Sequence, residues 1–147
     1  MSTSGDPGHG GGGTAVRANG IREAYVGLFG QVPLSIEHRI ELAELTGRLD
    51  AVEVIEALRR ALVTENPLGA KQQQLVHFGQ LVALGHRELA LLHARAARRA
   101  GATPAELVGV VETALITAGM PAYSQGVSTL TELFRQDELK GAPDDRQ

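Results

Sequence analysis

The sequence predicts an all-α protein, and three of its features support this. Hydrophobic residues make up 43% of the 147 residues and charged residues 21%, which is ordinary for a soluble globular protein with one domain and one core. Aromatic residues make up only 3% and Trp is absent, so the core must be built from Leu, Val, Ile and Ala, which favours packed helices. From Val16 onward the apolar residues recur at helical spacing, and no segment alternates with period two.

Both ends of the chain are expected to be disordered tails around a domain of residues 16–137. Residues 1–15 are rich in Gly, which has the largest backbone entropy cost on ordering. They have no basic start and no apolar run, so they predict neither a signal peptide nor a membrane span. No strand precedes them, so a phosphate-binding loop is not supported. Residues 138–147, which end in an acidic segment, form the second expected tail.

Three helices are predicted in the first half of the domain. The first begins near Val16 and stops at residues 30–33, where Gly and Pro interrupt the pattern. The second has Ser35 as N-cap and closes at Gly47. The third has Asp50 as N-cap, with Glu53 completing a capping-box pattern. Its apolar stripe, which is expected to face the core, consists of Val54, Ile55, Leu58 and Leu62.

The second half predicts four more helical segments. Residues 71–84 form the first, and residues 86–100 form the next, which ends at Gly101. Thr103, Pro104 and Glu106 then give the clearest start signal in the chain, because an N-cap Thr, a Pro at the first helical position and a Glu at the third occur together. Residues 119–121 separate this helix from a last one that runs through Phe134.

Composition excludes several classes of function. The net charge is −3 and the basic residues are dispersed, which is not the footprint of a nucleic-acid-binding protein. The chain has no Cys, so disulfides, thiolate metal sites and dithiol redox chemistry are absent. No nucleotide fingerprint, Ser-centred elbow or Walker loop occurs. We therefore expect a cytoplasmic protein that binds neither nucleic acid nor a membrane.

Two of the five histidines, His86 and His93, lie seven residues apart and so return to nearly the same face of a helix. Leu89 lies on that face between them. Glu88 is rotated by roughly 140° from His93, so it joins a shared pocket only if the helix starts late or a neighbouring subunit supplies the wall. Structural roles remain open: His86 as a helix-entry residue, Glu88 as a partner of the helix dipole, and His93 as a satisfied buried histidine.

A neutral imidazole near pH 7 is a natural proton shuttle for enol chemistry, which makes His93 the leading catalytic candidate. A metal site is not expected, because the His-Glu-x-x-His spacing is absent and only one carboxylate lies near the two histidines.

The motifs around these residues resemble those of the carboxymuconolactone decarboxylase and alkylhydroperoxidase D-like family, over residues 71–134. The matching segments are Ala83-Leu84-Gly85-His86, Glu88, His93-Ala94-Arg95-Ala96-Ala97, Arg99-Ala100-Gly101-Ala102-Thr103 and Ala118-Gly119-Met120-Pro121-Ala122. The resemblance implies a single-domain helical bundle of the alkylhydroperoxidase D-like type. It also implies a homotrimer or homohexamer, with a histidine pocket between helices near a subunit interface.

The resemblance assigns roles residue by residue. In the peroxidase branch the dithiol stands at the positions of His86 and Leu89, so this Cys-free chain cannot run that chemistry. The decarboxylase-like branch implies His93, His86 and Glu88 as catalytic residues. Leu89 and Gln74 stand where family members usually have acidic or thiol side chains, and Thr117 replaces a frequent Tyr, which places the parent decarboxylation in doubt and makes the pocket more apolar.

If Gln74 lines the pocket as its family counterpart does, His77 and Phe78 are expected beside it, because the three lie on one helix face. Gln74, His77, Phe78 and Leu89 are thus the predicted substrate-binding residues. Such a pocket suits a neutral, carbonyl-bearing substrate. His93 would carry the proton, and His86 or Gln74 would stabilise an enolate oxygen.

Three hypotheses follow. The first is a cofactor-free lyase or isomerase that acts by His-mediated proton transfer on an enolisable acid, lactone or carbonyl compound. The second is a tailoring enzyme of secondary metabolism that catalyses cyclisation, hydration or oxygenation of a polyketide-like compound. The third is a non-catalytic scaffold that binds a small molecule, since fold analogy does not fix function. The expected partners are a small-molecule substrate and other copies of the chain, with no cofactor and no metal.

Overall fold

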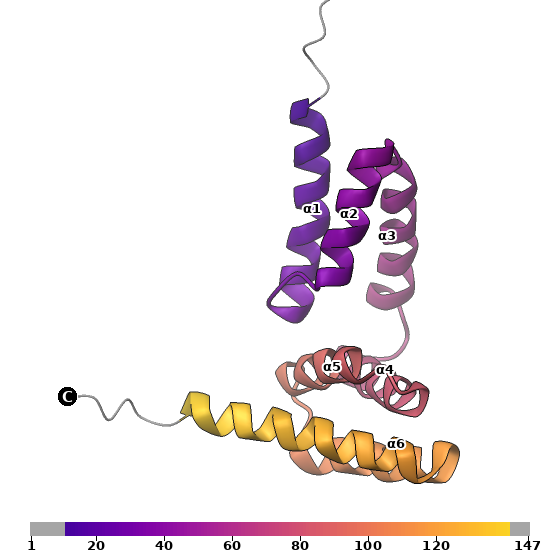
Figure 1. The fold of residues 1–147 in the computed structure, drawn as a ribbon, viewed down its shortest axis with the longest axis vertical. Helices are drawn as coiled ribbons and strands as arrows, with labels where there is room; N and C mark the ends of the chain where they lie inside the picture. The colour runs from indigo at the N-terminus through magenta and orange to yellow at the C-terminus, as the bar shows by residue number, and fades with distance from the viewer. Residues whose placement is uncertain (1–10, 142–147) are drawn as a thin grey trace, which may run out of the picture. The chain divides into compact units, whose positions relative to one another are not determined.

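The computed structural model describes residues 11–141, which form six helices and contain no strand (Figure 1). This confirms the predicted all-α class for the described part of the chain. The helices are α1 (Gly11–Phe29), α2 (Leu34–Thr46), α3 (Leu49–Thr64), α4 (Ala70–Leu84), α5 (Arg87–Arg99) and α6 (Pro104–Gly141).

The chain divides into two compact units, Met1–Glu65 and Asn66–Gln147, where composition predicted a single core. Helices α1, α2 and α3 contact one another in the first unit, and α4, α5 and α6 contact one another in the second. Asn66 and Pro67 begin the second unit, because Pro removes a backbone donor and disfavours helix in the residue before it.

The predicted tail boundaries differ from the structure at both ends. Helix α1 begins at Gly11, so residues 11–15 are helical, and α6 continues to Gly141, beyond the predicted domain end at residue 137. Extending an existing helix adds one hydrogen bond for each residue fixed, whereas starting one fixes several residues for a single bond. Residues 1–10 and 142–147 of the predicted tails lie outside the described residues.

Two predicted N-caps in the first unit are wrong. The N-cap of α2 is Pro33, not Ser35, and the N-cap of α3 is Arg48, not Asp50. Gly47 adopts the left-handed conformation that was predicted for the end of α2, and α3 begins so soon after this turn that Asp50 falls within its first helical turn. Asp50 and Glu53 pair instead with Arg17 of α1.

The apolar stripe predicted to bury α3 is exposed. Val54, Ile55, Leu58 and Leu62 are 69%, 51%, 60% and 61% exposed, while the opposite face of α3 buries Leu49, Val52 and Glu56. On the buried face, the Glu56 carboxylate accepts hydrogen bonds from Tyr25, Arg39 and Arg59 at 2.7–2.9 Å. A buried carboxylate must be paired in this way to be tolerated.

In the second unit, the core lies where α4, α5 and α6 meet. Its buried side chains are Phe78, Val82, Ala90, Ala94, Ala97, Ala102, Leu107, Val111, Ala114, Ala122, Leu130 and Leu133. Gly85 closes α4 in the left-handed conformation, and the amide of His86 donates to the Leu81 carbonyl. The predicted capping box at the start of α6 is confirmed, since the Glu106 amide donates to Thr103 Oγ1 and the Thr103 amide to Glu106 Oε2.

Helix α6 is interrupted where the sequence predicted a break. Gly119 has φ 80° and ψ −175°, a conformation outside the helical region, and Pro121 follows. The halves on either side pack against each other, because a Cβ at Gly126 would lie only 2.7 Å from Val111. Residues 104–138 are long and apolar enough to cross a membrane by length and composition alone, since an 18-residue window within them has a mean hydropathy of 1.3. Six side chains of this helix nevertheless belong to the core of the second unit: Leu107, Val111, Ala114, Ala122, Leu130 and Leu133.

Candidate functional site

Helices α4 and α5 bring three of the predicted site residues together. Gln74 and His77 are one helical turn apart on α4 and face α5. His93 lies on α5, between Leu92 and Ala94, both of which are buried. The small residues Ala90, Ala94 and Ala97 are buried on α5, so the two helices can approach closely at this point.

His93 contacts both α4 residues directly. Its Nδ1 lies 2.8 Å from Gln74 Oε1, a hydrogen-bond distance. Its ring stands 4.8 Å from the ring of His77, centroid to centroid, with the planes tilted by 31°. Gln74 is 3% exposed, so its amide belongs to the interior, whereas His77 and His93 are each partly buried.

The hydrogen bond determines which nitrogen of His93 is basic. An amide oxygen can only accept, so Nδ1 of His93 carries the proton and donates it to Gln74. In the neutral ring the lone pair is then on Nε2. Burial, and secondarily the charge of His77, lowers the pKa of His93 to about 4. His93 is therefore neutral at pH 7, with Nε2 as an acceptor of protons.

The other predicted catalytic residues lie at the amino-terminal end of α5. His86 is the N-cap residue, and Glu88 lies in the first turn, where its charge complements the helix dipole. Both side chains are exposed, and Leu89 is 40% exposed. Glu88 could join the pocket if α5 started late or if a neighbouring subunit supplied the wall. Helix α5 starts at Arg87, before Glu88, so the first of these conditions is not met. Their roles stay predictions.

Phe78, predicted to bind substrate, is fully buried in the core of the second unit. It belongs to the same core cluster as Val82 and Leu107, and its burial there helps to hold α4 in place. No group of three or more His, Cys, Asp or Glu side chains that could hold a metal occurs within residues 11–141.

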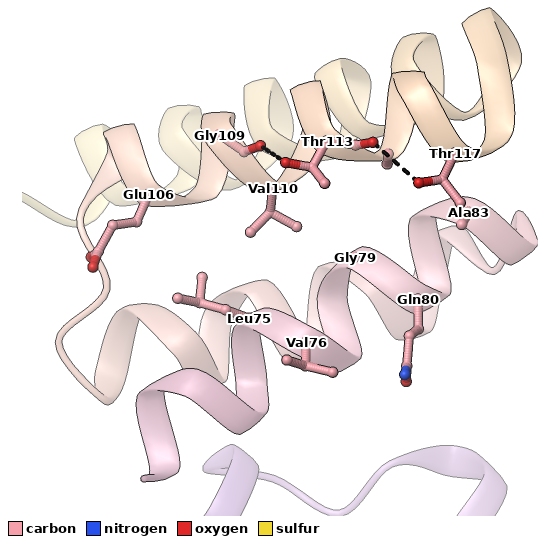
Figure 2. Close-up of a pocket in the computed structure, with 11 residues that line it drawn as sticks. Leu75, Val76, Gly79, Gln80, Ala83, Glu106, Gly109, Val110, Thr113 and Thr117 are labelled. Carbon is pink, nitrogen blue, oxygen red and sulfur yellow. Dashed lines mark hydrogen bonds between the residues drawn. The ribbon is translucent and has the colours of Figure 1, made fainter. Parts of the chain in front are cut away.

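A groove that sequence reasoning missed lies between α4 and the first half of α6, with a volume of about 670 Å³ (Figure 2). Leu75, Val76 and Val110 are its largest apolar side chains. The hydroxyls of Thr113 and Thr117 donate to carbonyls of their own helix, as the dashed lines in Figure 2 show. The complete lining is Leu75, Val76, Gly79, Gln80, Ala83, Glu106, Gly109, Val110, Thr113, Ala114 and Thr117.

None of the predicted catalytic or substrate-binding residues lines this groove, although Thr117, which the resemblance singled out, does. On α4 it follows Leu75, Gly79 and Ala83, a face roughly opposite the one that carries His77 and Gln74. The one sequence feature that could have indicated this groove is Gly79, which lies inside a predicted helix. A Gly inside a helical pattern usually has a packing reason, and a Cβ at Gly79 would lie 2.9 Å from Val110.

Two comparisons with known proteins agree with this fold. The carboxymuconolactone decarboxylase family matches residues 50–132 of the chain. A solved structure from Burkholderia xenovorans, provisionally named a carboxymuconolactone decarboxylase, is similar with a TM-score of 0.68 and 20% identity. The match covers 88% of this chain and 99% of that one, and at this identity it shows the shared fold. No curated protein matches the chain.

Proposed function

The chain belongs to the carboxymuconolactone decarboxylase family, and from this premise we propose that it is a cofactor-free enzyme in which His93 moves a proton on an enolisable acid, lactone or carbonyl compound. The two reactions that we propose for such an enzyme are decarboxylation and isomerisation. The absence of Cys supports a lyase or isomerase over a peroxidase, since a dithiol cannot form.

The observation that carries the proposal is the hydrogen bond between His93 and Gln74. It places the lone pair of the neutral ring on Nε2, and the lowered pKa keeps the ring neutral at pH 7. A base within hydrogen-bond reach of an acidic C–H group can remove its proton, and the electron pair then moves onto the neighbouring carbonyl as an enolate.

The surroundings favour an uncharged reacting group. Gln74 supplies an amide rather than a carboxylate, and Leu89 adds an apolar side chain on the same α5 stripe as His93. A carboxylate beside His93 would favour the imidazolium and so raise the pKa of His93. The neutral amide of Gln74 adds no such charge, and His93 is neutral at pH 7.

A turnover assay with the full, chelator-treated chain tests this function. Carboxymuconolactone, other enolisable lactones and β-keto acids are incubated with the protein, and products are followed by mass spectrometry. We expect His93→Ala to abolish product formation, whereas His38→Ala, which removes an exposed histidine on α2, leaves it unchanged. Full turnover by His93→Ala would contradict the proposal.

The groove between α4 and α6 favours a second candidate function, the binding of an apolar small molecule without turnover. Its volume lies within the range of small-molecule sites, and its lining is mainly apolar. Gly109→Leu should narrow the groove, because Gly109 lines it and a Cβ there meets nothing within 4 Å that would oppose the larger side chain.

Binding of Nile red, a neutral apolar dye, provides the readout. We expect Gly109→Leu to weaken it by about tenfold, or roughly 1.4 kcal/mol. The control Glu112→Leu adds the same side chain at an exposed position of α6 that does not line the groove. Equal binding by both variants would place the dye elsewhere.

A further inference from the structure

His77 is the titratable residue whose ring stands beside that of His93, 4.8 Å away and tilted by 31°. The proposed function uses His93 as a base but assigns no donor to return a proton. We infer that His77 is the proton donor of the same site, and that the two histidines together shift the double bond of a β,γ-unsaturated lactone or carbonyl compound. This inference rests on the proposed function.

In its resting state His93 provides a proton acceptor for a double-bond shift, which removes a proton from one carbon and delivers a proton to another. Its one N–H, on Nδ1, is held by Gln74 Oε1 at 2.8 Å, and Nε2 carries a lone pair. The proton that Nε2 removes from the α carbon can return to that carbon without any net reaction. A second group with a transferable proton beside the base can protonate the γ carbon directly, so that Nε2 need not carry its proton from one carbon to the other.

His77 lies close enough to His93 to be that group. A base and an acid that act on the α and γ carbons of one small substrate must each reach its own carbon at about 2.6–3.2 Å. Those carbons are separated by a single atom, so the base and the acid must stand side by side, and the ring centroids of His77 and His93 are 4.8 Å apart. His77 is also partly exposed, so solvent can restore its proton.

The alternative donors are less well placed. His86 precedes His93 by seven residues, or about 10 Å along the helix axis, and its side chain is exposed at the start of α5. Glu88 lies on the first turn of α5 and is also exposed. Neither shares the close ring contact that His77 makes with His93.

Electrostatics keeps the two roles distinct. The charge of His77 lowers the pKa of His93, which adds to the effect of burial. When His77 holds a proton, protonation of His93 is therefore disfavoured further, and the pair contains one acid and one base rather than two acids.

The reaction balances without a cofactor. His93 Nε2 takes the α proton, the C–H electron pair forms a dienolate with the lactone carbonyl, and the N–H of protonated His77 delivers its proton to the γ carbon. The double bond moves into conjugation, His93 becomes cationic and His77 neutral. Proton exchange with water restores both, and no electron is gained or lost.

The test follows α-angelica lactone, a five-membered β,γ-unsaturated lactone, in D₂O by NMR with the full chain. Exchange of the α hydrogen for deuterium reports His93, whereas formation of the conjugated lactone with deuterium at the γ carbon reports His77. Rates in buffer alone are subtracted. His77→Asn removes the donor, and His77→Phe also removes it but keeps a flat ring for packing. If one of the two variants fails to fold, the other still tests the role of His77. His38→Asn is the control for loss of a histidine elsewhere.

We expect both His77 variants to retain α exchange within about threefold while the double-bond shift falls by roughly 100-fold or more, the usual range for loss of a general acid. His93→Ala should lose both signals. A shift at the wild-type rate in the His77 variants, or loss of exchange and shift together, would overturn the inference and leave the proposed function standing. Wild-type rates of exchange and shift in His93→Ala, or no exchange by the wild-type chain, would overturn both.

Discussion

Gln74 Oε1 accepts the hydrogen bond of His93 Nδ1 at 2.8 Å, and this contact between α4 and α5 orients the base of the proposed site. The resemblance implied that family members usually have an acidic residue at position 74, so Gln74 placed the parent decarboxylation in doubt. In the structure the amide has a positive role, since it selects the tautomer of His93 without placing a negative charge beside it.

Gln74→Glu should raise the pKa of His93 above its present value of about 4, because a neighbouring carboxylate stabilises the imidazolium. NMR titration of the His93 ring measures the change directly. The acid limb of the rate profile should move to higher pH with it. Gln72→Glu introduces the same charge at an exposed position of α4 and should leave the His93 titration in place. An unchanged pKa in Gln74→Glu would mean that this contact does not control the ring.

Stability should decrease as the pH falls from about 6.5 to about 4. The pKa of His93 is lower in the folded chain than its ordinary value of 6.5, so the unfolded chain binds the proton more readily within this window. Stability from this source is complete above pH 6.5 and is lost progressively below it. Urea denaturation at several pH values measures the slope, and His93→Gln should make it shallower. An equal slope in the two proteins would assign the effect to other groups.

Gly126→Ala should destabilise the chain by about 1–3 kcal/mol, the usual cost of overpacking. A Cβ at this position would lie 2.7 and 2.8 Å from the two methyl groups of Val111, where the halves of α6 pack together. Gly126→Ala should cost less stability in a chain that already carries Val111→Ala than in the wild-type chain, because the shorter side chain removes the clash. Gly109→Ala, on the same helix with nothing within 4 Å of its Cβ, is the control and should not destabilise. Urea midpoints provide the comparison.

We propose that the chain self-associates through the exposed apolar stripe of α3, because contiguous large hydrophobic residues on a surface mark an interaction site. Leu58→Glu, at the centre of this stripe, should lower the molar mass measured by light scattering. Glu41→Leu changes an exposed residue of α2 in the opposite sense and should not reduce the assembly. A monomeric wild-type chain, or an unchanged mass in Leu58→Glu, would contradict this proposal.

The sequence by itself determined the helical class, most helix ends and the family motifs. These depend on local chemistry: Gly47, Gly85 and Gly119 adopt backbone conformations that other residues avoid, and the Thr103–Glu106 capping box is closed between residues three apart. The expectation that His77 lies near Gln74 followed from helical spacing, because both residues share one helix.

Tertiary structure alone decided which faces are buried and which side chains meet across helices. The α3 stripe predicted to face the core is exposed, and the face of α3 that is buried carries Glu56, whose carboxylate is paired with Tyr25, Arg39 and Arg59 from other turns and helices. The same holds for the site. His93 meets Gln74 and His77 only because α4 packs against α5, a contact between residues far apart in sequence that no local pattern specifies.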